Sequence, residues 1–215
     1  LEPSSAASDV YKRQNQPFYE FSLKLWEGLE QDFNYNAMVS QRGVYNVYHS
    51  DAQRDAYRRR GNAMILHGAD AELLDAAQLR GECPFLNFDN ARLPVMGALV
   101  QRRGGTVRHD AVAWGYARGA DRRGVDIIQN CEVTGFRIQN GRCTGVETSR
   151  GFIAARKVGC AVAGSSSRVM QAAGMRLPIE SHVLQAFVSE GLKPIIPGVI
   201  TYGCLLYTSP SPRDR

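Results

Sequence analysis

The sequence predicts a mixed α/β fold, and three patterns support this. Apolar residues recur with helical spacing over residues 18–33 and 109–123. Short segments of alternating apolar and polar residues follow glycines, which is typical of strands. Asn140-Gly141 separates two such segments and is a strong hairpin signal, because both residues tolerate a positive φ angle. The chain therefore combines helices with at least one antiparallel hairpin.

The first half of the chain predicts helices around short strands. Apolar spacing or a high content of charged residues predicts helices over residues 18–33, 52–66 and 70–79. Gly43 precedes an alternating strand over 44–48, and a short apolar stretch follows over 94–100. Pro84 stops any helix that continues from residue 79. Gly104-Gly105 then breaks the chain before the helix over 109–123.

The second half predicts a β-meander that leads into a further strand and a helix. Apolar or alternating runs predict strands over residues 125–128, 132–139, 143–148, 152–154, 157–163 and 182–190. Gly164 ends the apolar strand over 157–163, and a run of serines leads into a helix over 167–173. This order is found in the closing half of a dinucleotide-binding α/β domain with an inserted meander, although many α/β proteins share it.

Charge and cysteine content narrow the range of functions. The net charge is +5, and the basic residues are scattered along the chain. The run Arg58-Arg59-Arg60 is more typical of a solvated helix face than of a binding site for an acidic partner. The charge pattern therefore gives no indication of nucleic-acid binding. The cysteines outside the C-terminal tail show neither CxxC spacing nor the Cys/His spacing of a zinc site. We therefore expect no metal and a reducing, cytoplasmic setting. No apolar run is long enough to predict a membrane span.

Both ends of the chain have an unusual composition. Residues 4–14 (SSAASDVYKRQ) and 204–214 (CLLYTSPSPRD) resemble translated adaptors of shotgun sequencing libraries. We therefore expect residues 1–14 and 204–215 to be adaptor-derived rather than native; a disordered Ser-rich head and Ser/Pro tail is the alternative. No GxGxxG motif between a strand and a helix occurs, which we expect if the native segment is an internal fragment.

Four segments carry a family resemblance: FYEFSLKLWEGLEQDFNYN from Phe18, SQRGVYNVYHSDAQRDAYRRR from Ser40, RGGTVRHDAVAWGYARGADRRGVDIIQNCEVTGF from Arg103 and LPIESHVLQAFVSEGLKP from Leu177. They resemble the beta subunits of heterotetrameric sarcosine oxidases, within the D-amino-acid-oxidase-like group of FAD-dependent flavoenzymes. The resemblance implies a partial FAD-binding dinucleotide domain with an inserted β-meander, and part of a mixed-sheet substrate domain. It assigns residues 15–106 to the substrate domain, 107–176 to the second half of the FAD-binding domain, and 177–203 to a return to the substrate domain.

The resemblance also implies an activity and partners. FAD in such a subunit receives a hydride from the N-methyl group of sarcosine, and electrons pass to a covalently bound FMN and then to oxygen. The product is glycine, and the one-carbon unit goes to tetrahydrofolate on the alpha subunit or leaves as formaldehyde. Alpha, gamma and delta subunits are the implied partners, with no nucleic acid and no membrane. We expect the truncated chain alone to be inactive.

Two other functions remain open at this point. The first is a single-flavin oxidase or dehydrogenase acting on dimethylglycine, glycine or an opine, most of which lack a second flavin. The second is a non-catalytic fragment or subunit. Most residues that contact the substrate are expected outside the chain, and Arg42, before the strand over 44–48, is not assigned to the substrate carboxylate.

His109 matches the family's FMN-linking histidine, in the setting Arg108-His109-Asp110. Attachment needs a neutral imidazole nitrogen, and a hydrogen bond that the second ring nitrogen donates to the Asp110 carboxylate would set the tautomer. Free N–H groups at a helix start would suit an anionic flavin or phosphate. The alternative is an ordinary polar residue near a helix N-cap. His49, His67 and His182 lack this setting, and we interpret them as structural.

Two further positions are implied to bind FAD. Val133 in CEVTGF is expected to pair with the adenine through its backbone, and the alternative is a plain strand valine. Ala163, Gly164 and Ser165 follow the apolar strand, where glycine allows a close approach to the cofactor. A simple turn with serine as helix cap would also explain these three residues.

Overall fold

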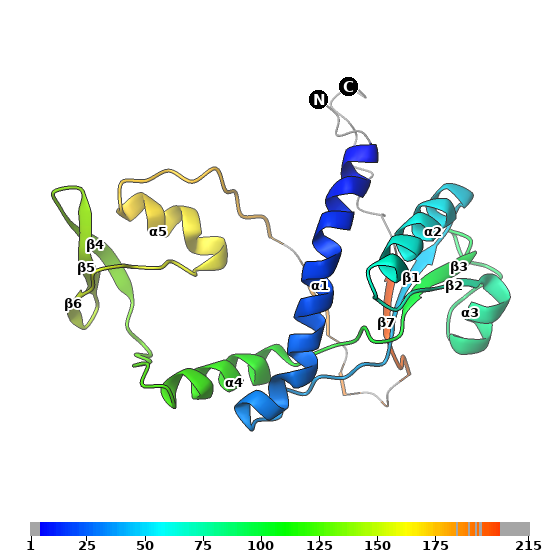
Figure 1. The fold of residues 1–215 in the computed structure, drawn as a ribbon, viewed down its shortest axis with the longest axis horizontal. Helices are drawn as coiled ribbons and strands as arrows, with labels where there is room; N and C mark the ends of the chain where they lie inside the picture. Colours follow the sequence, from blue (N-terminus) through cyan, green and yellow to red (C-terminus); the bar gives the residue numbers. More distant parts are fainter. Residues whose placement is uncertain (1–4, 184, 189, 192, 194, 203–215) are drawn as a thin grey trace. The chain divides into compact units, whose positions relative to one another are not determined.

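The computed structural model describes residues 5–183, 185–188, 190–191, 193 and 195–202. Their contacts form two compact units (Figure 1). The larger unit comprises Leu1–Gly124 and Lys193–Arg215, and the smaller unit comprises Val125–Leu192. These limits differ from the boundaries expected after residues 106 and 176, which were drawn by function and stay predictions.

A four-stranded mixed sheet is the centre of the larger unit. Its strands are β1 (Val44–Tyr48), β2 (Glu72–Asp75), β3 (Gly97–Gln101) and β7 (Val199–Tyr202), in the order β2-β3-β1-β7. β3 pairs antiparallel with both β1 and β2, whereas β7 pairs parallel with β1. The strand over 44–48 is confirmed, and β7 was not predicted although its sequence, VITY, suits a strand.

Four helices belong to the same unit: α1 (Ser5–Phe33), α2 (Asp51–Leu66), α3 (Ala76–Glu82) and α4 (His109–Asp121). Ser50 caps α2, because its side chain accepts a hydrogen bond from the Gln53 backbone N–H. α1 begins well before the expected Phe18, since no glycine or proline interrupts residues 5–16, and Pro17 lies inside the helix. No helix in the described part of the chain has the length and apolar character needed to cross a bilayer.

The prediction of one helix over residues 70–79 is wrong. Residues 72–75 form β2, because β3 offers backbone hydrogen-bond partners and the Leu74 side chain is buried in the core. Asp75 then ends the strand and caps α3 in a capping box: it accepts from the Gln78 N–H, while the Gln78 side chain accepts from the Asp75 N–H.

The hydrophobic core lies between the sheet and α3. Its members are buried residues of the strands, of α3 and of the loop after it: Tyr45, Val47, Leu74, Leu79, Cys83, Val95, Ala98 and Val100. Gly97 begins β3 with φ +148°, and an added Cβ would collide with the Leu74 carbonyl and the Tyr48 ring. Glycine is therefore required there, because Tyr48 donates a hydrogen bond to the Leu74 carbonyl across this space.

The smaller unit contains a three-stranded antiparallel meander of β4 (Val133–Gln139), β5 (Arg142–Thr148) and β6 (Gly151–Ala154). The predicted Asn140-Gly141 turn is confirmed, with φ angles of +48° and +74°. A 3-10 turn, η1 (Ala163–Ser165), leads into the short helix α5 (Ser166–Ala172), close to the predicted helix over 167–173.

Two predicted strands of the smaller unit are not formed. Residues 125–128 and 157–163 have no strand structure, and the apolar side chains of Val125, Ile127 and Ile128 are half exposed. Within the described residues, no neighbouring strand accepts their backbone hydrogen bonds, and an extended segment without such a partner is not stable. In the predicted strand over 182–190, residues 184 and 189 lie outside the described residues, and the others are not in a strand.

Candidate functional site

His109 is the first residue of α4, and its side chain is exposed. The N-cap residue, Arg108, has an extended backbone (φ −81°, ψ 110°) and makes no side-chain capping bond. Backbone N–H groups at an uncapped helix start carry partial positive charge and favour a nearby anion. The imidazole therefore lies beside the positive end of the α4 dipole, where the Asp110 carboxylate already binds the Ala111 N–H.

The expected hydrogen bond between Asp110 and His109 is not formed. Asp110 Oδ1 instead accepts from Arg108 Nε at 3.0 Å and from the Ala111 backbone N–H at 2.9 Å. The Arg108 guanidinium holds the pKa of the Asp110 carboxyl below its usual range. Within the described residues neither ring nitrogen of His109 has a hydrogen-bond partner, so a ligand can reach both.

The chain between β3 and α4 is fixed to the residues before β1. Ser40 and Thr106 exchange two backbone hydrogen bonds of 2.8 and 2.9 Å, and the Gly43 N–H donates to the Gly104 carbonyl at 2.9 Å. The backbones approach so closely that a Cβ on Gly105 would overlap the Ser40 carbonyl. The segment that carries His109 into α4 therefore starts from an immobilised turn.

A small hollow lies beside this turn. It has a volume of about 210 Å³ and is lined by Ser40, Arg42, Gly43, Gly105, Thr106 and residues 196–199. The first residues of β1 and β7 adjoin it, because the Val199 N–H donates to the Gly43 carbonyl. Arg42 is the cationic side chain of its wall.

Val133 is the first residue of β4, and its side chain is partly exposed. β4 lies at one edge of the meander, since the described sheet has the order β4-β5-β6. The outer backbone groups of an edge strand are free to bind a ligand. This arrangement fits the expected backbone contact with an adenine ring.

The turn over Ala163, Gly164 and Ser165 is exposed and has an unusual backbone. Ala163 has φ +43°, a conformation that few residues other than glycine adopt. Ser165 stands at the N-cap position of α5, as the alternative expects, but its side chain makes no capping hydrogen bond. Several backbone groups of this turn already have partners, because the Gly164 carbonyl accepts from Ser181 Oγ at 2.7 Å and the Ser165 N–H donates to the Val162 carbonyl at 2.9 Å.

The residues expected to bind FAD lie in the smaller unit, where α5 contacts β4, whereas His109 belongs to the larger unit. The remaining histidines have structural surroundings where contacts are described. The His67 backbone N–H closes the last turn of α2 on Met64 and Ile65 carbonyls, and His49 Nδ1 lies 2.8 Å from the Pro94 carbonyl. His182 is exposed. The described residues contain no cluster of three or more side chains suited to hold a metal ion.

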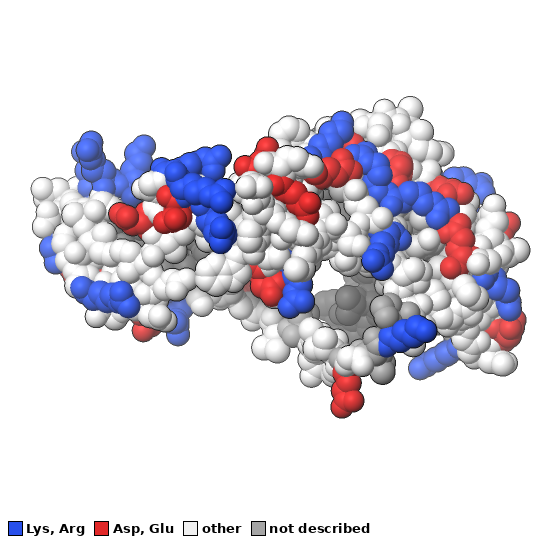
Figure 2. All heavy atoms as spheres, turned by 90° about the horizontal axis from the view of Figure 1, so that it is seen from below, with Lys and Arg blue, Asp and Glu red and all other residues white. Residues whose placement is uncertain are grey.

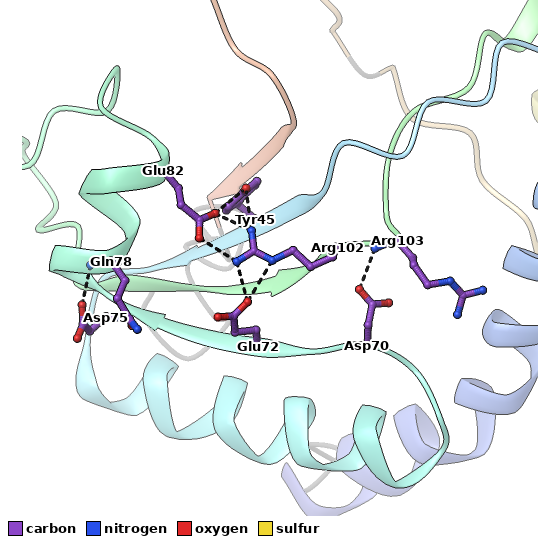
Figure 3. A network of polar contacts seen from close by, with 8 residues as sticks. All are labelled: Tyr45, Asp70, Glu72, Asp75, Gln78, Glu82, Arg102 and Arg103. Atoms are coloured by element: carbon purple, nitrogen blue, oxygen red, sulfur yellow. Dashed lines mark hydrogen bonds and ion pairs between the residues drawn. The ribbon is translucent and has the colours of Figure 1, made fainter.

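Sequence reasoning missed one group of residues near the His109 segment. Arg102 and Arg103, just after the end of β3, each bind two carboxylates. Figure 3 shows the two that bind Arg102, those of Glu72 and Glu82. On the face in Figure 2, basic and acidic side chains lie next to one another over much of the chain. The sequence offers one sign of these ion pairs. Two adjacent arginines precede Gly104-Gly105, and Glu20 and Glu27 lie seven residues apart, on the same face of one predicted helix.

Comparison with known proteins defines the class. A family model described as FAD dependent oxidoreductase matches residues 4–215. The chain therefore belongs to the family of FAD-dependent oxidoreductases. Solved structures agree on the fold: L-proline dehydrogenase from P. horikoshii matches with a TM-score of 0.65 at 20% identity, covering 73% of this chain and 40% of that one.

Sequence relatives narrow the class further. The chain is 76% identical over 189 residues to a sarcosine oxidase subunit beta of Rhizobium meliloti, a match that covers 88% of this chain and 45% of the relative. A subunit of the same name from Arthrobacter is 50% identical, over 85% of this chain and 45% of the relative. The chain thus spans about half the length of the curated relatives it matches.

Proposed function

We propose that the chain is part of the beta subunit of a sarcosine oxidase. The observation that carries this proposal is the 76% identity to the Rhizobium meliloti subunit, sustained over most of the chain. The whole enzyme converts sarcosine, water and dioxygen into glycine, formaldehyde and hydrogen peroxide. FAD supplies the acceptor for the hydride that leaves the N-methyl group, and the protein binds and orients both molecules.

The smaller unit supplies the FAD contacts in this proposal. The open backbone of β4 at Val133 pairs with the adenine, which explains why an apolar side chain is compatible with a polar contact. The left-handed Ala163 turns the chain so that the backbone at Gly164 and Ser165 faces the cofactor. Both positions bind through main-chain groups, so their side chains need carry no charge.

His109 holds FMN covalently in this proposal. Its exposed ring, without a protein partner for either nitrogen among the described residues, and the uncapped start of α4 fit an anionic flavin. Attachment replaces one hydrogen of the flavin 8α-methyl group and the ring N–H hydrogen with a carbon–nitrogen bond. The two hydrogens and their electrons reduce dioxygen to hydrogen peroxide. Arg108 and Asp110, on either side of His109 in the sequence, form an ion pair with no net charge.

The assembly follows from the same proposal. The FMN lies between this subunit and an alpha subunit that binds tetrahydrofolate, and gamma and delta subunits complete a cytoplasmic complex. Residues 15–106 and 177–203 contribute to the substrate domain, and residues 107–176 to the FAD-binding domain. In the complete enzyme, electrons from sarcosine reach oxygen by way of both flavins.

A peptide analysis of the full-length subunit, co-expressed with its alpha partner, tests the assignment of His109. Trypsin cuts after Arg108 and Arg118 and releases the ten-residue peptide from His109 to Arg118. We expect this peptide to carry the mass of FMN, and His109→Gln to abolish it while FAD remains bound. An unmodified wild-type peptide in an intact, FAD-containing complex would instead indicate a single-flavin relative.

A further inference from the structure

Arg103 links the end of β3 to helix α1 through a double ion pair. Its Nε and Nη2 atoms donate to the two carboxylate oxygens of Glu27 at 3.0 and 2.8 Å, and Nη1 donates to Glu20 Oε1 at 2.8 Å. A guanidinium that binds a carboxylate with two parallel hydrogen bonds is fixed in direction as well as position. Gln41 strengthens the junction, because its Nε2 donates to Glu27 Oε1 and to the Arg103 carbonyl, both at 2.7 Å.

The backbone of Arg103 is held as firmly as its side chain. Its N–H donates to Asp70 Oδ2 at 2.8 Å (Figure 3), which ties the turn to the segment before β2. The next residues make the backbone bonds to Gly43 and Ser40 described above. Arg103 therefore joins three elements at one point: α1, the α2–β2 connection and the chain before β1.

The neighbouring Arg102 has a different role. It binds Glu72 and Glu82, each with an N–O distance of 2.6 Å, and lies near the Tyr45 hydroxyl. Figure 3 shows the two guanidinium groups leaving the chain on different sides. Arg102 ties β3 to β2 and α3 within the sheet and has no described contact with α1, so it is a matched control for Arg103.

The charges around Arg103 disfavour its replacement by a neutral side chain. Glu20 is a buried carboxylate with 8% of its surface exposed, and its Oε2 atom has no hydrogen-bond partner among the described residues. The hydrogen bonds from Arg103, and then from Gln41, lower the pKa of Glu27 to about 2. Removal of the guanidinium would leave the buried Glu20 carboxylate beside that of Glu27, with only the longer 3.7 Å contact to Lys24 as counter-charge, so the two carboxylates would repel each other.

We propose that Arg103 is the positioning residue for His109: its ion pairs to Glu20 and Glu27 fix the turn from which the chain enters α4. This inference rests on the proposed function of His109. Only three peptide steps separate Thr106, bound to Ser40, from His109, so the histidine lies within about 11 Å of a fixed point. Bond formation to a flavin requires a reacting distance near contact, where an error of about 1 Å costs on the order of 100-fold in rate.

The test compares Arg103→Met with Arg102→Met in the full-length subunit co-expressed with its alpha partner. Two quantities are measured: the rate at which the His109–Arg118 peptide acquires FMN, and amide hydrogen exchange over residues 104–111. We expect Arg103→Met to slow attachment at least about tenfold and to speed exchange, because the turn loses its anchor. Arg102→Met should leave both close to wild type. Equal behaviour of the two variants would overturn the inference.

Two milder variants keep the test decisive if Arg103→Met does not fold. Arg103→Lys retains the charge but loses the two-point bond to Glu27, and Glu27→Gln retains the shape but loses the charge. Both should give intermediate rates of attachment with normal FAD content, and wild-type rates in both would contradict the inference. If the wild-type peptide carries no FMN, the role of His109 fails, and hydrogen exchange alone then decides whether Arg103 fixes this turn.

Discussion

The two units contrast in how their sheets are stabilised. The four-stranded sheet of the larger unit has strand residues that are fully buried beneath α3, among them Val47, Leu74 and Val100. The three-stranded meander of the smaller unit is also hydrogen-bonded, with two register shifts between β4 and β5, yet every residue of the hydrophobic core belongs to the larger unit. Among the described residues of the smaller unit, Gly145 alone is buried.

This difference shows that backbone pairing and core formation are separable. A hydrogen bond contributes a modest net free energy because the unfolded chain bonds to water, whereas burial of apolar side chains supplies most of the stability. We therefore expect the larger unit to dominate the stability of the chain. Both tryptophans, Trp26 and Trp114, lie in that unit, so their fluorescence follows its unfolding alone.

The largest effect is expected from two matched glycines. Gly97 in β3 and Gly145 in β5 both have positive φ angles, +148° and +156°, and both face a carbonyl of the neighbouring strand. Gly97→Ala should destabilise the larger unit by about 4 kcal/mol, the upper range for one substitution, because the methyl group overlaps Leu74 and Tyr48. Gly145→Ala should leave the tryptophan-detected denaturation midpoint unchanged. A shift of that midpoint in Gly145→Ala would show that the units are coupled.

The same contrast explains which parts of the fold could be predicted. Local signals are reliable for the Asn140-Gly141 turn and the charged helix α2, because both form from residues close in sequence. The strand over 44–48 is also confirmed, because its alternating pattern is clear although its partners β3 and β7 are distant in sequence. The strands over 125–128 and 157–163 were predicted from apolar runs, and they fail because no described strand pairs with them. β2 was missed for the opposite reason, since its extended form depends on β3, which is distant in sequence.

The candidate site, too, could be predicted from the sequence only where the signal is local. A helix start at His109 could be foreseen from the sequence, and so could the glycine-containing turn at Gly164. The partner of Asp110 could not, because Arg108 and His109 lie two residues and one residue before it, and the sequence does not say which of them Asp110 binds. The Arg103 junction joins residues that lie 76 and 83 positions apart, beyond the range of any local pattern.

A smaller effect is expected from the helix caps of the two units. Asp75 accepts a hydrogen bond from the Gln78 N–H at 2.8 Å and caps α3, whereas Ser165 begins α5 without such a bond. Asp75→Ala should lower the free energy of unfolding of the larger unit by about 1 kcal/mol. Ser165→Ala should change stability by less than about 0.5 kcal/mol, as for a surface substitution. Urea denaturation followed by tryptophan fluorescence measures the stability change in Asp75→Ala, and amide hydrogen exchange in α5 measures it in Ser165→Ala. Equal losses of stability in the two variants would contradict the assigned capping bonds.

The smallest effect concerns acid sensitivity of the larger unit. The pKa of Glu27 is about 2 in the folded chain, compared with an ordinary value of 4.5, because Arg103 stabilises the carboxylate. A lowered pKa contributes stability above the unfolded value, and this contribution is lost as the pH falls from about 4.5 to 2. Glu27→Gln should therefore reduce the difference between denaturation midpoints measured at pH 5.5 and about pH 2.5. An unchanged difference would mean that this carboxylate does not set the acid response.

The parallel pairing of β7 with β1 has a consequence for the order of folding. The Thr201 hydroxyl donates to the Asn46 side chain across 155 residues of sequence, whereas the β4–β5 hairpin closes through a two-residue turn. During synthesis the hairpin can therefore form early, while β1 waits for β7 with one edge unpaired. Contacts of such large separation slow folding, and an open apolar edge attracts other chains. Chaperone dependence during translation should accordingly concentrate on β1, even though it becomes a central strand of the more stable unit.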